Sequence, residues 1–290
     1  MSVLAFEIAC AAVVLLSLAV FLRRIPWRTL LPLYLAIAIA AWAGEQSCIA
    51  LYRFYTYAPG WHLWIGDVPA LVPLIWPLVI LSAREVVSAL WLGAGAARAA
   101  LVAAVVAFDA SLVEVVAVDA GLWSWREPGH LGVPLIGILG WGCFAFAVDA
   151  LRGIPGRLGW RLLPILAPLV THLMLLALWW GGLRWVLRGD LAQAGFAGLA
   201  FLSLAATTEV LRARRRGRSL PPEVWIPRLV ATSLFVALLL TRAEHRALLA
   251  MHFGLVALPY LAALSLRGAA PVAAGAEAGA GSGASLGAGE

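Results

Sequence analysis

Two segments of the chain carry the same order of chemically active residues: a carboxyl, two aromatic residues separated by one position, a Val-Pro pair and a tryptophan. Proline and tryptophan are seven residues apart in both segments, and the acid precedes the first aromatic by ten residues in one and nine in the other. We interpret this as an internal pseudo-repeat. Its members are Glu45, Tyr55, Tyr57, Val68, Pro69 and Trp76 in the first copy, and Glu114, Trp123, Trp125, Val133, Pro134 and Trp141 in the second.

Carboxyls beside aromatic rings suit acid-catalysed chemistry on an alkene. Burial in an apolar medium disfavours the charged form of a carboxyl, so that a buried acid can donate a proton at neutral pH. Protonation of an electron-rich alkene gives a carbocation, which the faces of Trp and Tyr rings stabilise. We predict that Glu45 or Glu114 protonates the alkene and that the other acid, or Asp109, orients or deprotonates water. Tyr55, Tyr57, Trp76, Trp123, Trp125 and Trp141 are expected to line the substrate pocket.

The composition places these residues in a membrane. Of the 290 residues, 63% are hydrophobic and 12% are charged, against about 45–50% and about 25% in soluble domains. Crossing a bilayer core of roughly 30 Å takes about 20 apolar residues. We predict an all-α, polytopic integral membrane bundle of eight to nine transmembrane helices, forming one domain over residues 1–267. A Gly/Ala-rich tail, residues 268–290, is expected to be disordered. The expected spans are 3–22, 29–51, 68–92, 96–120, 133–151, 160–182, 189–211, 224–241 and 247–266.

The arginines predict the orientation of these spans. Loops after odd-numbered spans, together with the tail, hold 14 arginines, and loops after even-numbered spans hold six. The positive-inside rule then places the N-terminus outside a bacterial inner membrane. Because the arginines are dispersed between apolar segments, they do not indicate nucleic-acid binding; the expected surroundings are membrane lipids. The oligomeric state stays open.

Each repeat unit is expected to be organised by the membrane. The acid lies one to two turns inside the end of a span, the aromatic loop lies at the interface, and the proline occupies the first turn of the next helix. Both loops follow even-numbered spans, so both units open on the same face. An acid within a span is by default a functional candidate; besides the catalytic candidates these are Asp119, Asp67 and Asp149.

Other chemistries lack their usual residues. The helix-four acids Asp109, Glu114 and Asp119 are five residues apart, which is not the spacing of the Asp pairs that hold magnesium and diphosphate. The five histidines are scattered along the sequence. His62 and His130 lie in the repeat loops, where they could act as proton shuttles or be solvent-exposed loop residues. The three cysteines lie apart in apolar runs and predict neither a disulfide nor a zinc site. We expect no metal and no cofactor.

The repeat also resembles a known family over about residues 40–145. The segments Tyr55-Thr-Tyr57 with Asp67-Val-Pro-Ala-Leu-Val-Pro-Leu-Ile-Trp76, and Gly121-Leu-Trp-Ser-Trp125 with Gly132-Val-Pro-Leu-Ile-Gly-Ile-Leu-Gly-Trp141, are similar to carotenoid biosynthesis membrane proteins of the bisanhydrobacterioruberin hydratase and C-1′,2′ carotenoid hydratase type. This resemblance implies cofactor-free hydration of the terminal double bond of an acyclic carotenoid, a hydro-lyase activity on a hydrophobic isoprenoid.

The chain departs from that family at two places. Gly137-Ile138 stands where the family commonly has Asn-Phe, and Val115 follows Glu114 where Asp-Pro is usual. Two alternatives to hydration therefore stay open. A membrane terpene cyclase would use the same alkene protonation but exclude water, and a transporter or binding protein would carry an isoprenoid or lipid unchanged.

Overall fold

The computed structural model describes residues 1–91, 94–127, 129–154, 158–186, 191–220 and 222–264. Within these residues, nine helices are long and apolar enough to cross a membrane, which confirms the predicted all-α bundle and indicates a multi-pass membrane protein. The predicted tail lies outside the described residues. The helices are α1 (Val3–Leu22), α2 (Trp27–Tyr52), α3 (Leu71–Leu90), α4 (Gly95–Asp119), α5 (Leu135–Arg152), α6 (Leu158–Leu175), continued by a π-helical turn η1 (Leu176–Leu183) and by α7 (Arg184–Val186), then α8 (Leu191–Arg215), α9 (Pro222–Thr241) and α10 (Arg246–Leu264).

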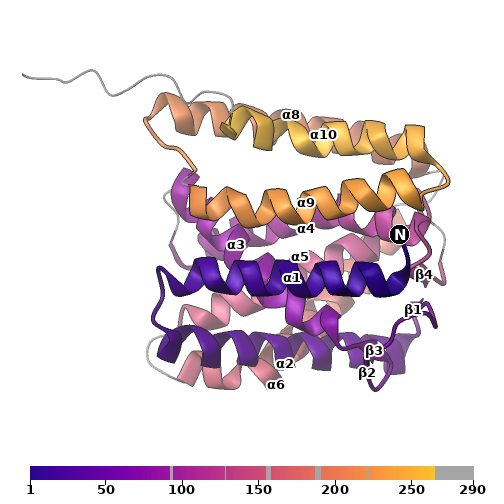
Figure 1. Cartoon of the computed structure of the whole chain (residues 1–290), viewed down its shortest axis with the longest axis horizontal. Coiled ribbons are helices and arrows are strands. Elements are labelled where there is room, and N and C mark those ends of the chain that lie inside the picture. Colours follow the sequence, from indigo (N-terminus) through magenta and orange to yellow (C-terminus); the bar gives the residue numbers. More distant parts are fainter. Residues whose placement is uncertain (92–93, 128, 155–157, 187–190, 221, 265–290) are drawn as a thin grey trace, which may run out of the picture.

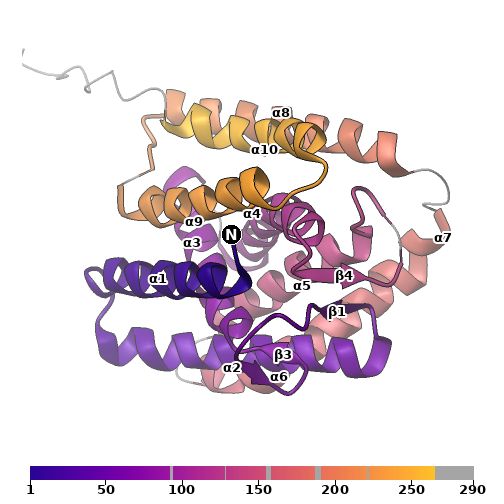
Figure 2. The same ribbon diagram turned by 45° about the vertical axis from the view of Figure 1, so that its right-hand side comes forward.

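The helices run roughly along one direction in stacked layers (Figure 1). Helices α8 and α10 pack on each other at one side, α2 and α6 pack on each other at the opposite side, and α4 and α5 pack between them. The first residues of α1 lie at the same end of the bundle as all four short strands (Figures 1 and 2). This end holds the aromatic loops of both repeat units.

The two aromatic loops form a small sheet that the sequence analysis did not predict. Strand β1 (Tyr55–Tyr57) pairs antiparallel with β4 (Trp123–Trp125), with Tyr55 opposite Trp125 and Tyr57 opposite Trp123. Successive strand residues point to opposite faces, so the four rings share one face, while Thr56 and Ser124 share the other, with their hydroxyl oxygens 3.3 Å apart. The pairing confirms that both loops lie on one face of the bundle.

The prolines of the repeat lie before the helices rather than in their first turns. Pro69 belongs to strand β3 (Val68–Pro69), which pairs with β2 (Trp64–Ile65), and α3 begins only at Leu71. Pro134 is the N-cap of α5. A proline has no N–H to donate and its φ is fixed, so it suits the extended residue that leads into a helix as well as the first turn itself. This corrects the expected start of the third span at residue 68.

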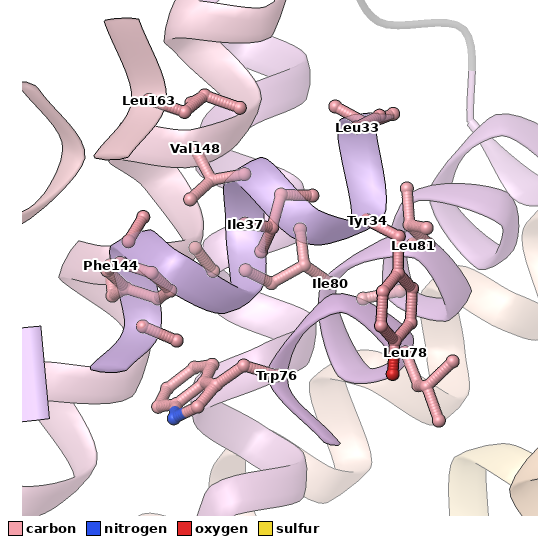
Figure 3. Packing of buried hydrophobic residues seen from close by; sticks show 14 of the residues in the cluster. Leu33, Tyr34, Ile37, Trp76, Leu78, Ile80, Leu81, Phe144, Val148 and Leu163 are labelled. Atoms are coloured by element: carbon pink, nitrogen blue, oxygen red, sulfur yellow. The ribbon is translucent and has the colours of Figure 1, made fainter. Parts of the chain in front are cut away.

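The largest hydrophobic core lies between α2, α3, α5 and α6. Leu30, Ile37, Ala83 and Val148 are fully buried there. Figure 3 shows Trp76 at the edge of this cluster, beside Phe144, with its indole nitrogen turned away from the aliphatic side chains. The core therefore holds the indole ring while leaving its N–H available to a partner outside the cluster.

The loop between α9 and α10 is held to α4 by a polar contact that responds to pH. Asp119 accepts hydrogen bonds from the backbone N–H of Glu244 and of His245, at 2.6 and 3.1 Å, and pairs with the His245 ring at 2.6 Å. The hydrogen bond to Asp119, its negative charge and that of Glu244 raise the pKa of His245 above the ordinary 6.5. Protonation of the His245 ring is therefore more favourable in the folded protein than in the unfolded chain.

We predict that His245→Gln lowers the thermal unfolding midpoint more at pH 5.5 than at pH 8.5. A histidine with a raised pKa in the folded state stabilises fully below its unfolded pKa, and the stabilisation disappears as the pH rises through the folded pKa. Thermal unfolding of wild type and variant in detergent across this range measures the difference. Asp119→Asn in both backgrounds is the control, since it should abolish the pH dependence of the difference; a difference that is constant with pH would contradict the prediction.

Candidate functional site

Glu45 accepts three hydrogen bonds, all from residues of its own repeat unit. The Trp76 indole N–H donates to Oε1 at 2.9 Å, and the hydroxyls of Tyr55 and Tyr57 donate to Oε2, the latter at 3.1 Å. Glu45 lies two turns before the end of α2, Trp76 in the second turn of α3, and the tyrosines on β1. Side chains from α3 and β1 thus meet at one carboxyl of α2.

Glu114 is held in the same way by the second unit. The indole N–H groups of Trp123 and Trp125 donate to Oε2 at 2.8 and 2.9 Å, and that of Trp141 donates to Oε1 at 2.7 Å. Glu114 is only 3% exposed, whereas Glu45 is partly exposed. The equivalent residues of the repeat therefore make equivalent contacts, as the spacing in the sequence predicted.

The two units also contact each other through equivalent residues. The Tyr55 ring packs on Trp125 with centroids 4.8 Å apart, and Tyr57 packs on Trp123 at 5.9 Å. These two contacts exchange when the copies are exchanged, which is the signature of a two-fold arrangement. Trp76 and Trp141, the last residues of the two copies, meet across it at 4.3 Å.

The two glutamates differ from the other acids of the spans in lacking a cationic or histidine partner. Glu85 pairs with Arg24, Asp109 with Arg228 and Asp149 with Arg84 and Arg98, while Glu7, Asp119 and Glu209 pair with His62, His245 and Arg212. Among the acids that the structure describes within the spans, only Glu45 and Glu114 are held by neutral donors alone. Asp67 lies in the loop before α3 and bonds to Gln46, away from both glutamates.

Both glutamates line one cavity of about 170 Å³ with mostly apolar walls. A dry cavity of about 150 Å³ holds benzene, so this space suits an apolar group of about six carbon atoms. Burial and the neighbouring Glu45 raise the pKa of Tyr55 and Tyr57 well above the ordinary value, which keeps both phenols neutral. All six aromatic residues predicted as pocket residues line this cavity: Tyr55, Tyr57, Trp76, Trp123, Trp125 and Trp141.

Asp109, the third predicted catalytic residue, does not line this cavity. It faces an adjoining one, where Arg228 donates to it at 2.5 and 2.9 Å and Tyr260 also donates. The residues five apart on α4 turn by roughly 140° relative to one another, at about 100° per residue. Asp109 and Glu114 therefore face different surroundings, and the structure does not bring Asp109 to the two glutamates.

The histidine that lines the cavity, His172, is one that the sequence analysis did not single out. Neither His62 nor His130 lines it, whereas His172 of α6 does. The Ser47 hydroxyl donates to the carbonyl oxygens of Ala43 and Gly44, so its oxygen accepts from His172 Nε2–H at 2.8 Å. His172 Nδ1 is buried and has no hydrogen-bond partner among the described residues, which leaves its lone pair free of a donor there. No local spacing marks this residue, because α6 is brought to α2 only by packing.

Comparisons with known proteins add no family to this geometry. No protein-family model, curated protein or solved structure matches the chain. Among the described residues, no three His, Cys, Asp or Glu side chains are placed to bind one metal ion.

A glycine on α5 makes room for one of the indoles. A Cβ added at Gly137 would lie 2.7 Å from Cζ2 of Trp125 and 3.0 Å from its Cη2. Gly137 is the position where the family that the sequence resembles has asparagine. In this chain the Trp125 ring occupies the space that such a side chain would need.

We predict that Gly137→Ala displaces the Trp125 indole and weakens its hydrogen bond to Glu114. Loss of a hydrogen bond to a charged or buried partner costs about 1–3 kcal/mol, so the thermal midpoint should fall by several degrees and the tryptophan fluorescence should change. Gly140→Ala on the same helix is the matched control, since an added Cβ there meets nothing within 4 Å. Equal effects of the two substitutions would contradict the packing described here.

Proposed function

We propose that the chain is a membrane enzyme that hydrates the terminal double bond of an acyclic isoprenoid, with a carotenoid as the substrate class that the sequence resemblance suggests. The observation that carries this proposal is the pair of carboxyls held by neutral donors over one apolar cavity. A cation in this cavity would face two carboxyl groups and several aromatic rings. Arginine beside either carboxyl would cancel that stabilisation, and within the part of the chain that the structure describes neither carboxyl pairs with one.

We assign the proton donor to Glu45 and the proton acceptor to Glu114. A phenol can accept as well as donate a hydrogen bond, whereas an indole N–H can only donate. A proton on Glu45 can thus be shared with Tyr55 or Tyr57, while a proton on Glu114 would face three donors. The types of the hydrogen-bond donors therefore favour a neutral Glu45 and an anionic Glu114.

The reaction then balances without a cofactor. Glu45 transfers its proton to the less substituted alkene carbon, whose π electrons form the new C–H bond and leave a tertiary cation. Water adds its lone pair to the cation, and Glu114 takes the proton that the resulting oxonium loses. A carboxylate has about four acceptor sites; three on Glu114 are occupied, which leaves one for the water. The proton returns to Glu45 through solvent after the tertiary alcohol leaves.

The same proposal includes an orientation. With 14 arginines in the loops after odd-numbered spans and the tail, and six in the others, the positive-inside rule places the N-terminus outside the cell. The aromatic sheet would then lie at the outer side of a bacterial inner membrane, and the substrate would enter from the lipid.

Ring closure without water is the second candidate function. It is favoured by the apolar lining of the cavity and by Gly137, which leaves no amide at the position where the hydratases that the sequence resembles commonly have asparagine. In that reaction an internal double bond attacks the cation, and loss of a proton to Glu114 completes the cyclisation.

We predict that a lycopene-accumulating bacterium expressing the chain forms a pigment 18 Da heavier than lycopene, and that Glu45→Gln lowers its amount about 10²–10⁴-fold, the usual contribution of a general acid. Glu114→Gln should lower it comparably, because it removes the proton acceptor. Mass spectrometry of extracted pigments measures both, and Glu7→Gln is a control acid outside the repeat.

The outcomes separate the candidates. An isomeric product of unchanged mass that needs both glutamates would support the cyclase, and lycopene recovered unchanged with the protein would support a carrier. Full product formation by both Gln variants, with protein present in normal amount, would contradict the assignment of the site.

A further inference from the structure

A second cavity, of about 360 Å³, continues the first one. The two share lining residues from α1, α3, α4, α5 and α9, among them Val13, Ile75, Trp141 and Phe235. On α1, Phe6 lines the first cavity and Phe21 the second, a separation of 15 positions or roughly 22 Å along the helix at about 1.5 Å per residue. We call the two adjoining cavities together the channel; their lining residues on α1 extend from near the aromatic sheet to Phe21.

The second cavity holds a polar cluster in otherwise apolar walls. Arg228 of α9 donates two hydrogen bonds to Asp109 of α4, and Tyr260 of α10 donates a third. The Arg228 guanidinium also lies over the Tyr260 ring, 5.3 Å from its centroid. Asp109 precedes Glu114 by five residues, roughly 7.5 Å deeper along α4. The cluster thus lies in the middle of the channel, away from the reacting end.

Two features of this cluster define what it can bind. Arg228 lines the cavity, and its Nε is buried and makes no hydrogen bond within the described residues, so its guanidinium keeps one strong donor without a partner. The charges of Arg228 and Asp109 cancel, so an anion placed there would add an uncompensated charge to an apolar channel. An uncharged oxygen can accept from Nε–H without that cost.

We propose that the Arg228–Asp109–Tyr260 cluster is a binding site for an uncharged oxygen of the substrate, an alcohol, ether or ketone set back from the alkene that reacts at Glu45 and Glu114. The ligand class, an acyclic isoprenoid, rests on the proposed function. Within that class, the cluster favours oxygen-bearing chains over hydrocarbons of the same length, and it gives a role to an ion pair that lines a cavity instead of being packed between helices.

The test compares ligands that differ in one atom. Methyl ethers of geraniol, farnesol and geranylgeraniol, and hydrocarbons with CH₂ in place of the oxygen, are titrated against the whole protein in detergent by tryptophan quenching. We expect the ether of one chain length to bind about tenfold more tightly than its hydrocarbon, a factor that corresponds to about 1.4 kcal/mol. The corresponding monophosphate should bind more weakly than the ether.

Arg228→Lys tests the donor itself. It keeps a cation beside Asp109 but removes the guanidinium Nε–H, so the ratio of ether to hydrocarbon affinity should fall to about one. Ser82→Ala, in the wall of the same cavity, should leave the ratio unchanged. Differences in detergent partitioning cancel, because the same ligand pair is compared in each protein.

The proposal is overturned if no ether is preferred in the wild type, if Arg228→Lys keeps the preference, or if the monophosphate binds most tightly. Should Arg228→Lys fail to fold, the wild-type comparison decides alone. Binding involves no hydration. An oxygen preference, with no product 18 Da heavier from either lycopene or the preferred ether, would therefore refute the proposed function and leave this site standing.

Discussion

The arrangement of this protein depends on burying two carboxyl groups without a cation. A buried polar group costs several kcal/mol unless hydrogen bonds replace its water. Glu45 and Glu114 each regain three such bonds, and every donor is an aromatic side chain that is itself half apolar. The donors satisfy the carboxyl oxygens while their rings form the cavity wall. An arginine could satisfy the carboxyl oxygens too, but its positive charge would neutralise the carboxylate.

This requirement explains the features of the repeat. Two donors must reach one carboxyl oxygen from the same side, and alternate residues of a strand point to the same face. The aromatic residues at 123 and 125 meet this condition on β4, and the pairing with β1 fixes both strands at once. The third donor has to approach the other oxygen, so it comes from the following helix. The Val-Pro pair separates these two parts and leads into that helix.

Much of this could be predicted from the sequence, because local spacing carries it. Apolar runs indicated the helices, and the recurrence of an acid, an aromatic pair and a tryptophan indicated residues that do meet. The sheet of β1 and β4 was missed because three-residue strands are stabilised by their partner, which lies 68 residues away. Asp109 was grouped with the glutamates because it lies deep in the same helix as Glu114. Five residues along that helix turn it by roughly 140° from Glu114, and it pairs with Arg228 of α9. His172 had no local signal at all.

The acids that pair with arginine and the two glutamates that neutral donors hold lie in different parts of the bundle. Toward the far end from the aromatic sheet, Asp149 with Arg84 and Arg98 ties α5 to α3 and α4, and these pairs line neither cavity. Arg228 with Asp109 is different, because it combines exact charge balance with an open cavity and a spare donor. Under the proposed function, the two carboxyls that lack a cationic partner have to lie at the reacting carbon. Because Arg228 and Asp109 balance each other's charge, the cluster would not disturb the electric field of the two glutamates. It would still offer a hydrogen bond that holds the distant part of the substrate in place.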